Sequence, residues 1–146
     1  MKVIVIVRRV PDPASLEVDQ RTGLVDFQRL VYITSPPDLC AVEEGLRLRE
    51  KAGGQVTVLA PGPPELENSL RECLALGADR VLRIWGSDWP REIPPSAAAF
   101  VLARVIRERN FDLVLCGENG GPLKRTRCRP GFPNVYRFPW SRLSRI

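Results

Sequence analysis

The stretch KVIVIVRR, residues 2–9, decides the fold of this 146-residue chain. Its five consecutive β-branched residues, Val3 to Val7, are typical of a strand that is buried on both faces of a parallel sheet. Two arginines then end the apolar run. Because parallel neighbours are joined by long crossovers, usually helices, this strand predicts that helices and further apolar strands alternate downstream.

That alternation follows along the chain. The first helix is expected to begin at Ser35-Pro36-Pro37-Asp38, with Asp38 as its N-cap, and to stop at Gly53-Gly54. A second helix ends at a Gly77 cap, and a third covers residues 96–110. The inner stripe of the second helix is expected to comprise Leu66, Leu70, Cys73 and Leu74. Further strands are expected at residues 55–60, 81–85 and 113–116.

Four strands joined by right-handed crossovers form an open parallel sheet, most simply in the order 3-2-1-4, with helices on both faces. We therefore predict a Rossmann-like α/β fold. In such sheets ligands bind beyond the carboxyl ends of the two strands where the order reverses, which here are Ile6-Val7 and Gly117. The loop Gly117-Glu118-Asn119-Gly120-Gly121 offers backbone N–H groups suited to an anion, although a flexible connection is an equally good interpretation of the loop alone.

The sequence contains no signature of catalysis. It has no histidine, which excludes histidine-based triads and histidine-ligated metals. It has neither a P-loop nor a G-x-G-x-x-G motif after the first strand. The four cysteines form no C-x-x-C pair, and we expect them to be reduced. The sequence therefore predicts a nucleotide-binding protein that is not an enzyme, with no catalytic and no metal-binding residues.

Charge and periodicity divide the chain near Gly121. Seven of the 22 basic residues and none of the 17 acidic residues follow it, so the net charge is −2 before this point and +7 after it. Residues 122–146 also contain four prolines and show neither helical nor strand spacing. We predict a nucleotide-binding α/β domain at residues 1–121 and a basic tail, rich in Pro and Arg, with little regular structure at residues 122–146.

Four stretches of the chain occur in the order and spacing of the electron transfer flavoprotein β subunit. They are KVIVIVRRVPD at 2–12, AVEEGLRLREK at 41–51, LALGADR at 74–80 and DLVLCG at 112–117. The chain resembles that family over about residues 1–117, roughly the first half of the family's length. The resemblance implies a fold akin to the adenine-nucleotide α-hydrolase group. It also implies an electron carrier that forms a heterodimer with an α subunit and passes electrons from dehydrogenases to the respiratory chain.

The same resemblance implies the cofactors. The α subunit of the family carries most of the shared FAD site, whereas the β subunit holds AMP or, in electron-bifurcating members, a second FAD. Carried over by position and combined with the strand ends above, the expected cofactor-binding residues are Ile6, Val7, Ser35, Pro36, Pro37, Asp38, Pro61, Gly117, Glu118, Asn119, Gly120 and Gly121. We expect a cytoplasmic protein, because the cysteines are expected to be reduced. We expect no membrane insertion, because the apolar run at the start is too short for a span or a signal sequence, and no nucleic-acid partner.

The sequence departs from the family at three places. Ser35 stands where the family commonly has Asn, Pro37 replaces an aromatic residue, and nothing after Gly117 aligns, which suggests a truncated or frame-disrupted relative. We expect such a chain to carry electrons poorly and to leave apolar surface exposed on one face of its sheet. Two other interpretations stay open: a stress-type ATP- or AMP-binding module of the same fold without an electron-transfer role, and a nucleic-acid-binding protein that uses the basic tail.

Overall fold

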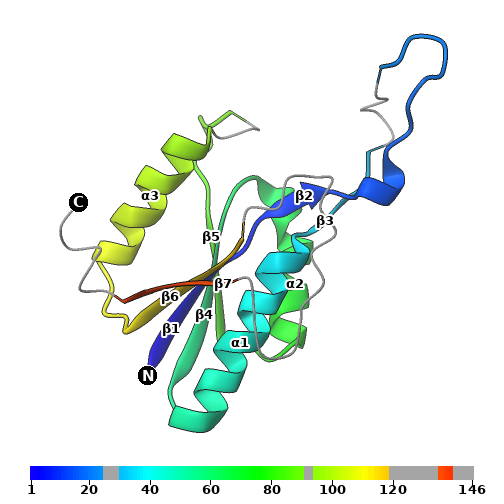
Figure 1. Ribbon diagram of the computed structural model, residues 1–146. Coiled ribbons are helices and arrows are strands. Elements are labelled where there is room, and N and C mark those ends of the chain that lie inside the picture. The colour runs from blue at the N-terminus through cyan, green and yellow to red at the C-terminus, as the bar shows by residue number, and fades with distance from the viewer. Residues whose placement is uncertain (25–29, 91–93, 119–134, 140–146) are drawn as a thin grey trace.

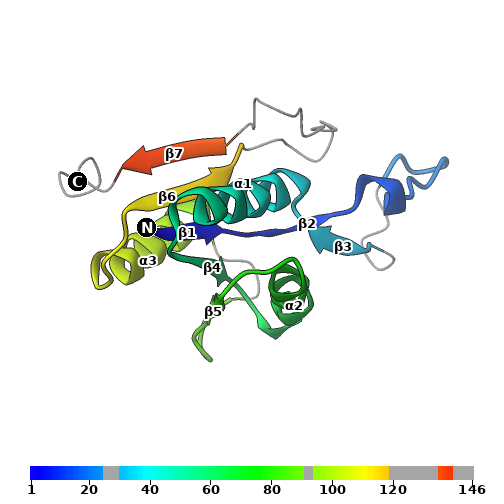
Figure 2. The same cartoon turned by 90° about the horizontal axis from the view of Figure 1, so that it is seen from below.

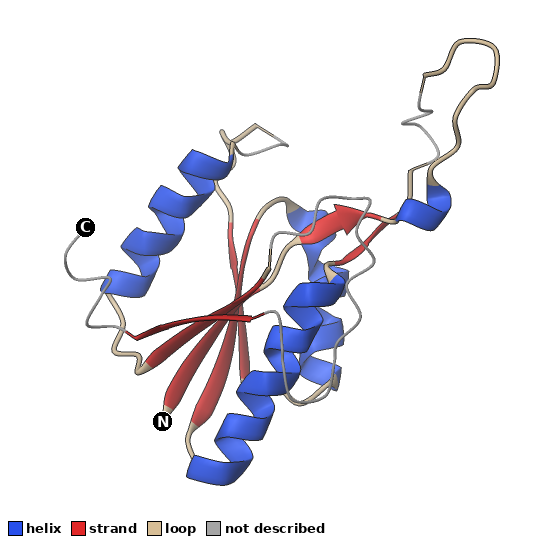
Figure 3. Ribbon diagram, viewed as in Figure 1, coloured by secondary structure: helices blue, strands red, loops and turns tan. Residues whose placement is uncertain are grey.

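The computed structural model describes residues 1–24, 30–90, 94–118 and 135–139, which form an α/β fold (Figures 1 and 3). The main sheet contains β1 (Lys2–Ile6), β4 (Gln55–Pro61), β5 (Arg80–Ile84), β6 (Leu113–Gly117) and β7 (Val135–Pro139). The α-helices of the described residues are α1 (Pro36–Ala52), α2 (Glu67–Ala75) and α3 (Pro95–Arg107). A second, two-stranded sheet pairs β2 (Arg9–Pro11) with β3 (Tyr32–Thr34), and 3-10 turns cover Pro13–Ser15 and Pro64–Leu66.

The strand order of the main sheet is β5-β4-β1-β6-β7, and its first four strands are parallel. These four are the third, second, first and fourth strands expected from the sequence, so the predicted open parallel sheet and its order are confirmed. β7 lies within the 122–146 segment and pairs antiparallel with β6. The division of the chain at residue 121 stays a prediction, because the rest of that segment lies outside the described residues.

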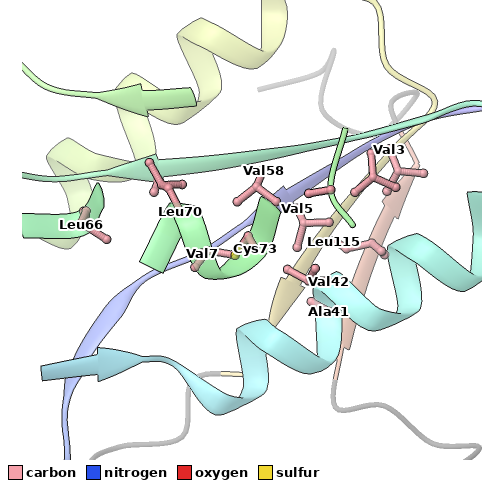
Figure 4. Packing of buried hydrophobic residues seen from close by; sticks show 13 residues of the cluster. Val3, Val5, Val7, Ala41, Val42, Val58, Leu66, Leu70, Cys73 and Leu115 are labelled. Carbon is pink, nitrogen blue, oxygen red and sulfur yellow. The ribbon is translucent and has the colours of Figure 1, made fainter. Parts of the chain in front are cut away.

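The alternating side chains of β1 build two separate cores. Its odd-numbered residues Val3 and Val5, and Val7 directly after the strand, are buried with residues of α1 and α2, as Figure 4 shows. Its even-numbered residue Ile4 is buried with Ile106 of α3 on the other face. Because side chains of a strand point alternately to opposite faces, the central strand can bury both sets only if helices cover both sides. α3 indeed lies on one side of the sheet and α1 and α2 on the other (Figures 1 and 2).

Two expectations about the helices are wrong in detail. α1 begins at Pro36 with Ser35 in the N-cap position, so Asp38 lies inside the first turn and is not the cap. A proline at the first helical position costs no hydrogen bond, so the helix can begin at Pro36, before the Asp38 that was expected to cap it. In α2, Leu70 and Cys73 are buried as expected, but Leu74 is 44% exposed. The buried residues of α2 are Ser69, Leu70 and Cys73, and Leu74 lies to one side of the face that they form.

The expected reduced state is also wrong for one cysteine. Cys40 is disulfide-bonded, whereas Cys73 and Cys116 are free thiols. A disulfide depends on proximity in space, and spacing along the sequence does not reveal which cysteines meet.

The segment between β1 and α1 forms an arm that extends away from the main sheet (Figure 1). Its base is the β2–β3 pair, in which the guanidinium carbon of Arg9 lies 5.3 Å from the ring centre of Tyr32. Among the described helices, none combines the length and the apolar character needed to cross a bilayer.

Candidate nucleotide-binding site

The carboxyl ends of β1 and β6 lie side by side. Ile6 pairs in register with Cys116, and Gly117 is the next and last residue of β6. Ile6 and Gly117 therefore lie on adjacent strands at the same edge of the sheet, as the sequence predicted. The strand order reverses here, which is where open α/β sheets bind ligands. We call the ends of β1 and β6, together with the start of α1, the switch-point edge.

Asp38 in the first turn of α1 joins three segments at the switch-point edge. Its side chain has no access to solvent. One carboxylate oxygen, Oδ2, accepts hydrogen bonds from the backbone N of Arg8 at 2.9 Å and from Arg8 Nε at 3.0 Å. The other, Oδ1, accepts from Arg8 Nη2 at 3.0 Å and from the backbone N of Gly117 at 3.1 Å. The Ser35 N–H donates to the Arg8 carbonyl at 2.9 Å, so α1 is tied to the exits of both strands.

Gly117 approaches the start of α1 more closely than another residue type would allow. A Cβ atom on Gly117 would lie 2.4 Å from Asp38 Oδ1 and 2.5 Å from the carbonyl carbon of Pro37. Gly117 is not among the glycines with positive φ, so the site needs glycine for space and not for backbone conformation. The sequence singled out Gly117 for its approach to a ligand, whereas the structure shows an approach to α1, with its N–H already donated to Asp38.

The start of α1 offers no unpaired backbone donor. Pro36 and Pro37 have no N–H group, and the N–H groups of Asp38 and Leu39 donate to the Ser35 carbonyl at 2.9 and 3.0 Å. The first turn of a helix usually leaves its N–H groups unpaired, and anions bind there for that reason. A phosphate at the switch-point edge would therefore need a side chain or another segment of the chain as its donor.

Arg8 supplies a cation at this edge, and the sequence reasoning did not nominate it. Its side chain is 37% exposed, although its guanidinium is paired with the buried Asp38. The hydrogen bond that Arg8 donates to Asp38 raises the pKa of Arg8 above its ordinary value, against the opposing effect of desolvation, so the group stays charged. A signal was present in the sequence, because Arg8 directly follows the first strand. Its partner lies 30 residues away, at a distance that no local spacing rule covers.

Apolar side chains line the same edge on the α3 side. Ile6 is partly buried and packs against the cluster that includes Leu59 and Ile106. Pro61 ends β4 two residues after Leu59, so it points to the same side of the sheet. Cys116, opposite Ile6, is a free thiol of intermediate exposure. The edge thus combines apolar side chains with the cationic Arg8.

The other expected residues differ in exposure. Val7, Ser35 and Pro37 are buried, whereas Pro36 and Glu118 are exposed. Asn119, Gly120 and Gly121 lie outside the described residues. Contact of any of these residues with a nucleotide stays a prediction. Within the described ranges, no group of three or more His, Cys, Asp or Glu residues is placed to hold a metal ion.

Comparisons with known proteins point to one family. The sequence profile of the electron transfer flavoprotein domain matches residues 22–124. The electron transfer flavoprotein subunit beta of Thermoanaerobacterium thermosaccharolyticum is 35% identical over 122 residues, which cover 80% of this chain and 45% of the relative. Protein FixA of Azotobacter vinelandii is 35% identical over 123 residues, covering 81% of this chain and 43% of the relative. The acryloyl-CoA reductase electron transfer subunit gamma of Anaerotignum propionicum is 30% identical over 119 residues, covering 80% and 45%.

The chain spans less than half the length of each of these relatives. Even so, the profile match covers more than half of the chain. It includes α1, β4 and β6, which carry Asp38, Pro61 and Gly117 of the switch-point edge. The sequence resemblance to this family is thereby confirmed, and the chain belongs to the electron transfer flavoprotein domain family.

Proposed function

We propose that this chain is a β-subunit-like electron transfer flavoprotein that binds AMP or FAD at the switch-point edge. In this proposal it is a carrier subunit and not an enzyme. It pairs with an α subunit that holds the shared FAD, and the heterodimer passes electrons from dehydrogenases to the respiratory chain. The matched relatives support an electron-transfer role, since their names describe electron transfer subunits.

One observation carries the nucleotide part of this proposal. Asp38 brings the exit of β1, the start of α1 and Gly117 at the exit of β6 to one edge of the sheet. That edge is the reversal point of the strand order, where this class of sheet binds its ligands. The buried carboxylate of Asp38 fixes the spacing of the two strand exits, and this supports the proposal more than nearness of the strand ends alone would.

The described residues fit a nucleotide in chemical terms. A purine base packs well against apolar surface, and Ile6 and Pro61 provide partly exposed apolar side chains. A phosphate group is recognised by a guanidinium, which Arg8 provides. When FAD is bound, it supplies the electron-accepting and electron-donating chemistry, and this chain contributes binding and orientation.

The remaining parts of the proposal follow from the same assignment. The nucleotide-binding domain comprises residues 1–121, with the basic tail at 122–146, and the protein acts in the cytoplasm. The alternative of a stress-type ATP- or AMP-binding module is not favoured, because the profile that matches residues 22–124 is that of the electron transfer flavoprotein domain.

Calorimetric titration of the purified chain with AMP and with FAD tests the nucleotide site. We expect saturable binding of at least one of the two, near one ligand per chain, and little dependence on salt concentration. Alkylation with iodoacetamide then locates the site: bound ligand slows the reaction of the partly exposed Cys116, and the buried Cys73 is the internal control. Binding of neither ligand would overturn the proposed nucleotide site, whereas binding without protection of Cys116 would place it elsewhere.

Co-expression tests the proposed partner. The chain is produced together with the α subunit of a matched electron transfer flavoprotein, such as that of Thermoanaerobacterium thermosaccharolyticum, and an affinity tag is placed on the chain alone. We expect the α subunit and yellow flavin absorbance to co-purify with the tag. Recovery of the tagged chain with neither the α subunit nor flavin absorbance would contradict the proposed heterodimer.

A further inference from the structure

We infer that Asp38 is a positioning residue of the nucleotide site, which sets the spacing of the two strand exits without touching the ligand. This inference rests on the proposed nucleotide binding at the switch-point edge. The sequence resemblance placed Asp38 among the cofactor contacts, and the geometry points to a different role. Its carboxylate has no solvent-accessible surface, so a bound ligand has no route to it.

The hydrogen bonds of Asp38 are all directed at the protein. Three of them come from Arg8, through the backbone N, Nε and Nη2, and the fourth comes from the backbone N of Gly117. These donors lie 30 and 79 residues away in the sequence. The one carboxylate therefore fixes the exit of β1 relative to the exit of β6, and both exits border the site.

The same carboxylate sets the direction of Arg8. Its two side-chain bonds hold the guanidinium in a two-pronged geometry at 3.0 Å each. The partly exposed cation is thus held in one orientation at the edge where a phosphate would approach. Loss of the carboxylate would free Arg8 and release the Gly117 N–H together.

An amide in place of the carboxylate cannot reproduce this pattern. Both oxygens of Asp38 accept from N–H donors, whereas an Asn side chain has one accepting oxygen and one donating NH₂ group. The NH₂ group of the Asn side chain would then face an N–H donor of Arg8 or Gly117. Asp38→Asn should therefore loosen either the Arg8 contact or the Gly117 contact while it preserves the side-chain volume.

Asp79 provides a matched control within the chain. Its carboxylate also accepts from a backbone N–H, that of Val56 at 2.7 Å, and pairs with an arginine, Arg49, at 3.1 Å. It precedes β5 and contacts the first part of β4, so it lies at the amino edge of the sheet, opposite the switch-point edge. Asp79→Asn thus removes similar interactions from a place where no nucleotide is proposed.

AMP and FAD binding is measured by calorimetry for the full chain, Asp38→Asn and Asp79→Asn, with thermal unfolding followed in parallel. We expect both variants to be destabilised, Asp38→Asn to bind at least about tenfold more weakly, and Asp79→Asn to keep the affinity of the unmodified chain. A merely structural role for Asp38 would lower stability in both variants and affinity in neither.

The outcomes separate this inference from the function on which it rests. If the unmodified chain binds neither ligand, the proposed function fails. If the unmodified chain binds and Asp38→Asn binds as tightly as Asp79→Asn, the proposed function stands and the positioning role is overturned. If Asp38→Asn does not fold, Asp38→Glu decides the question, because glutamate keeps the charge and both accepting oxygens but adds a methylene that changes the spacing of the two strand exits. Weaker binding by Asp38→Glu then supports the positioning role, and unchanged binding overturns it.

Discussion

Replacement of Gly117 by alanine tests the close contact between β6 and α1. The added Cβ would lie 2.4 Å from Asp38 Oδ1, whereas ordinary contacts begin at 3.4 Å, so the two elements must move apart by about 1 Å. That movement stretches the 3.1 Å bond from the Gly117 N–H to Asp38 beyond hydrogen-bonding range. Loss of a bond to a charged acceptor costs about 1.5–3 kcal/mol and overpacking about 1–3 kcal/mol, so we expect a total of about 2.5–6 kcal/mol.

Urea unfolding of the full chain measures this loss, and Gly53→Ala is the control. Gly53 has a φ of +66° with no atom within 4 Å of the added Cβ, so its replacement tests backbone strain without a steric contact. Strain of that kind costs about 1–2 kcal/mol. A loss for Gly117→Ala no larger than that for Gly53→Ala would refute the close approach of β6 to α1.

Three further predictions concern the core and the ionisable groups. Leu59→Ala should lower the free energy of unfolding by about 2–5 kcal/mol in urea titrations, whereas Phe100→Ala, at a side chain 76% exposed, should change it by less than about 0.5 kcal/mol. Burial raises the pKa of the Cys73 thiol to about 11 from an ordinary 9.0, so stability should be constant below pH 9 and fall as pH rises toward 11, with a shallower fall in Cys73→Ser. The hydrogen bond from the Val56 N–H, helped by Arg49, lowers the pKa of Asp79. The contribution of ionised Asp79 to the stability of the folded chain is therefore present above pH 3.8 and is lost as pH falls through the lowered pKa. Acid unfolding of Asp79→Asn should show a smaller loss of stability over that range.

The sheet could be predicted because its information is local. Runs such as Val3 to Val7 are apolar at every position, and only a strand covered on both faces can bury such a run. The rule of right-handed crossovers then leaves few strand orders, and the simplest one is the order observed. The placement of Ile6 and Gly117 at one edge follows from that order without any further assumption.

The role of Asp38 could not be predicted in the same way. A carboxylate at the start of a helical pattern usually caps the helix, and the sequence offered no sign of its contacts with Arg8 and Gly117. Those contacts depend on where two distant strands end. Leu74 was misplaced for a related reason, because helical spacing shows which side chains share a face but not how much of that face the sheet covers.

The central position of β1 has a consequence for how the chain folds. Val3 pairs with Val56 on one side and with Leu113 on the other, 53 and 110 residues downstream. β1 therefore gains its second neighbour only after a further 110 residues have been made. Until then its run of valines and isoleucines has an open edge, which is the kind of segment that pairs with other chains. Slow folding and aggregation during synthesis are expected to depend on how soon residues 113–117 reach β1.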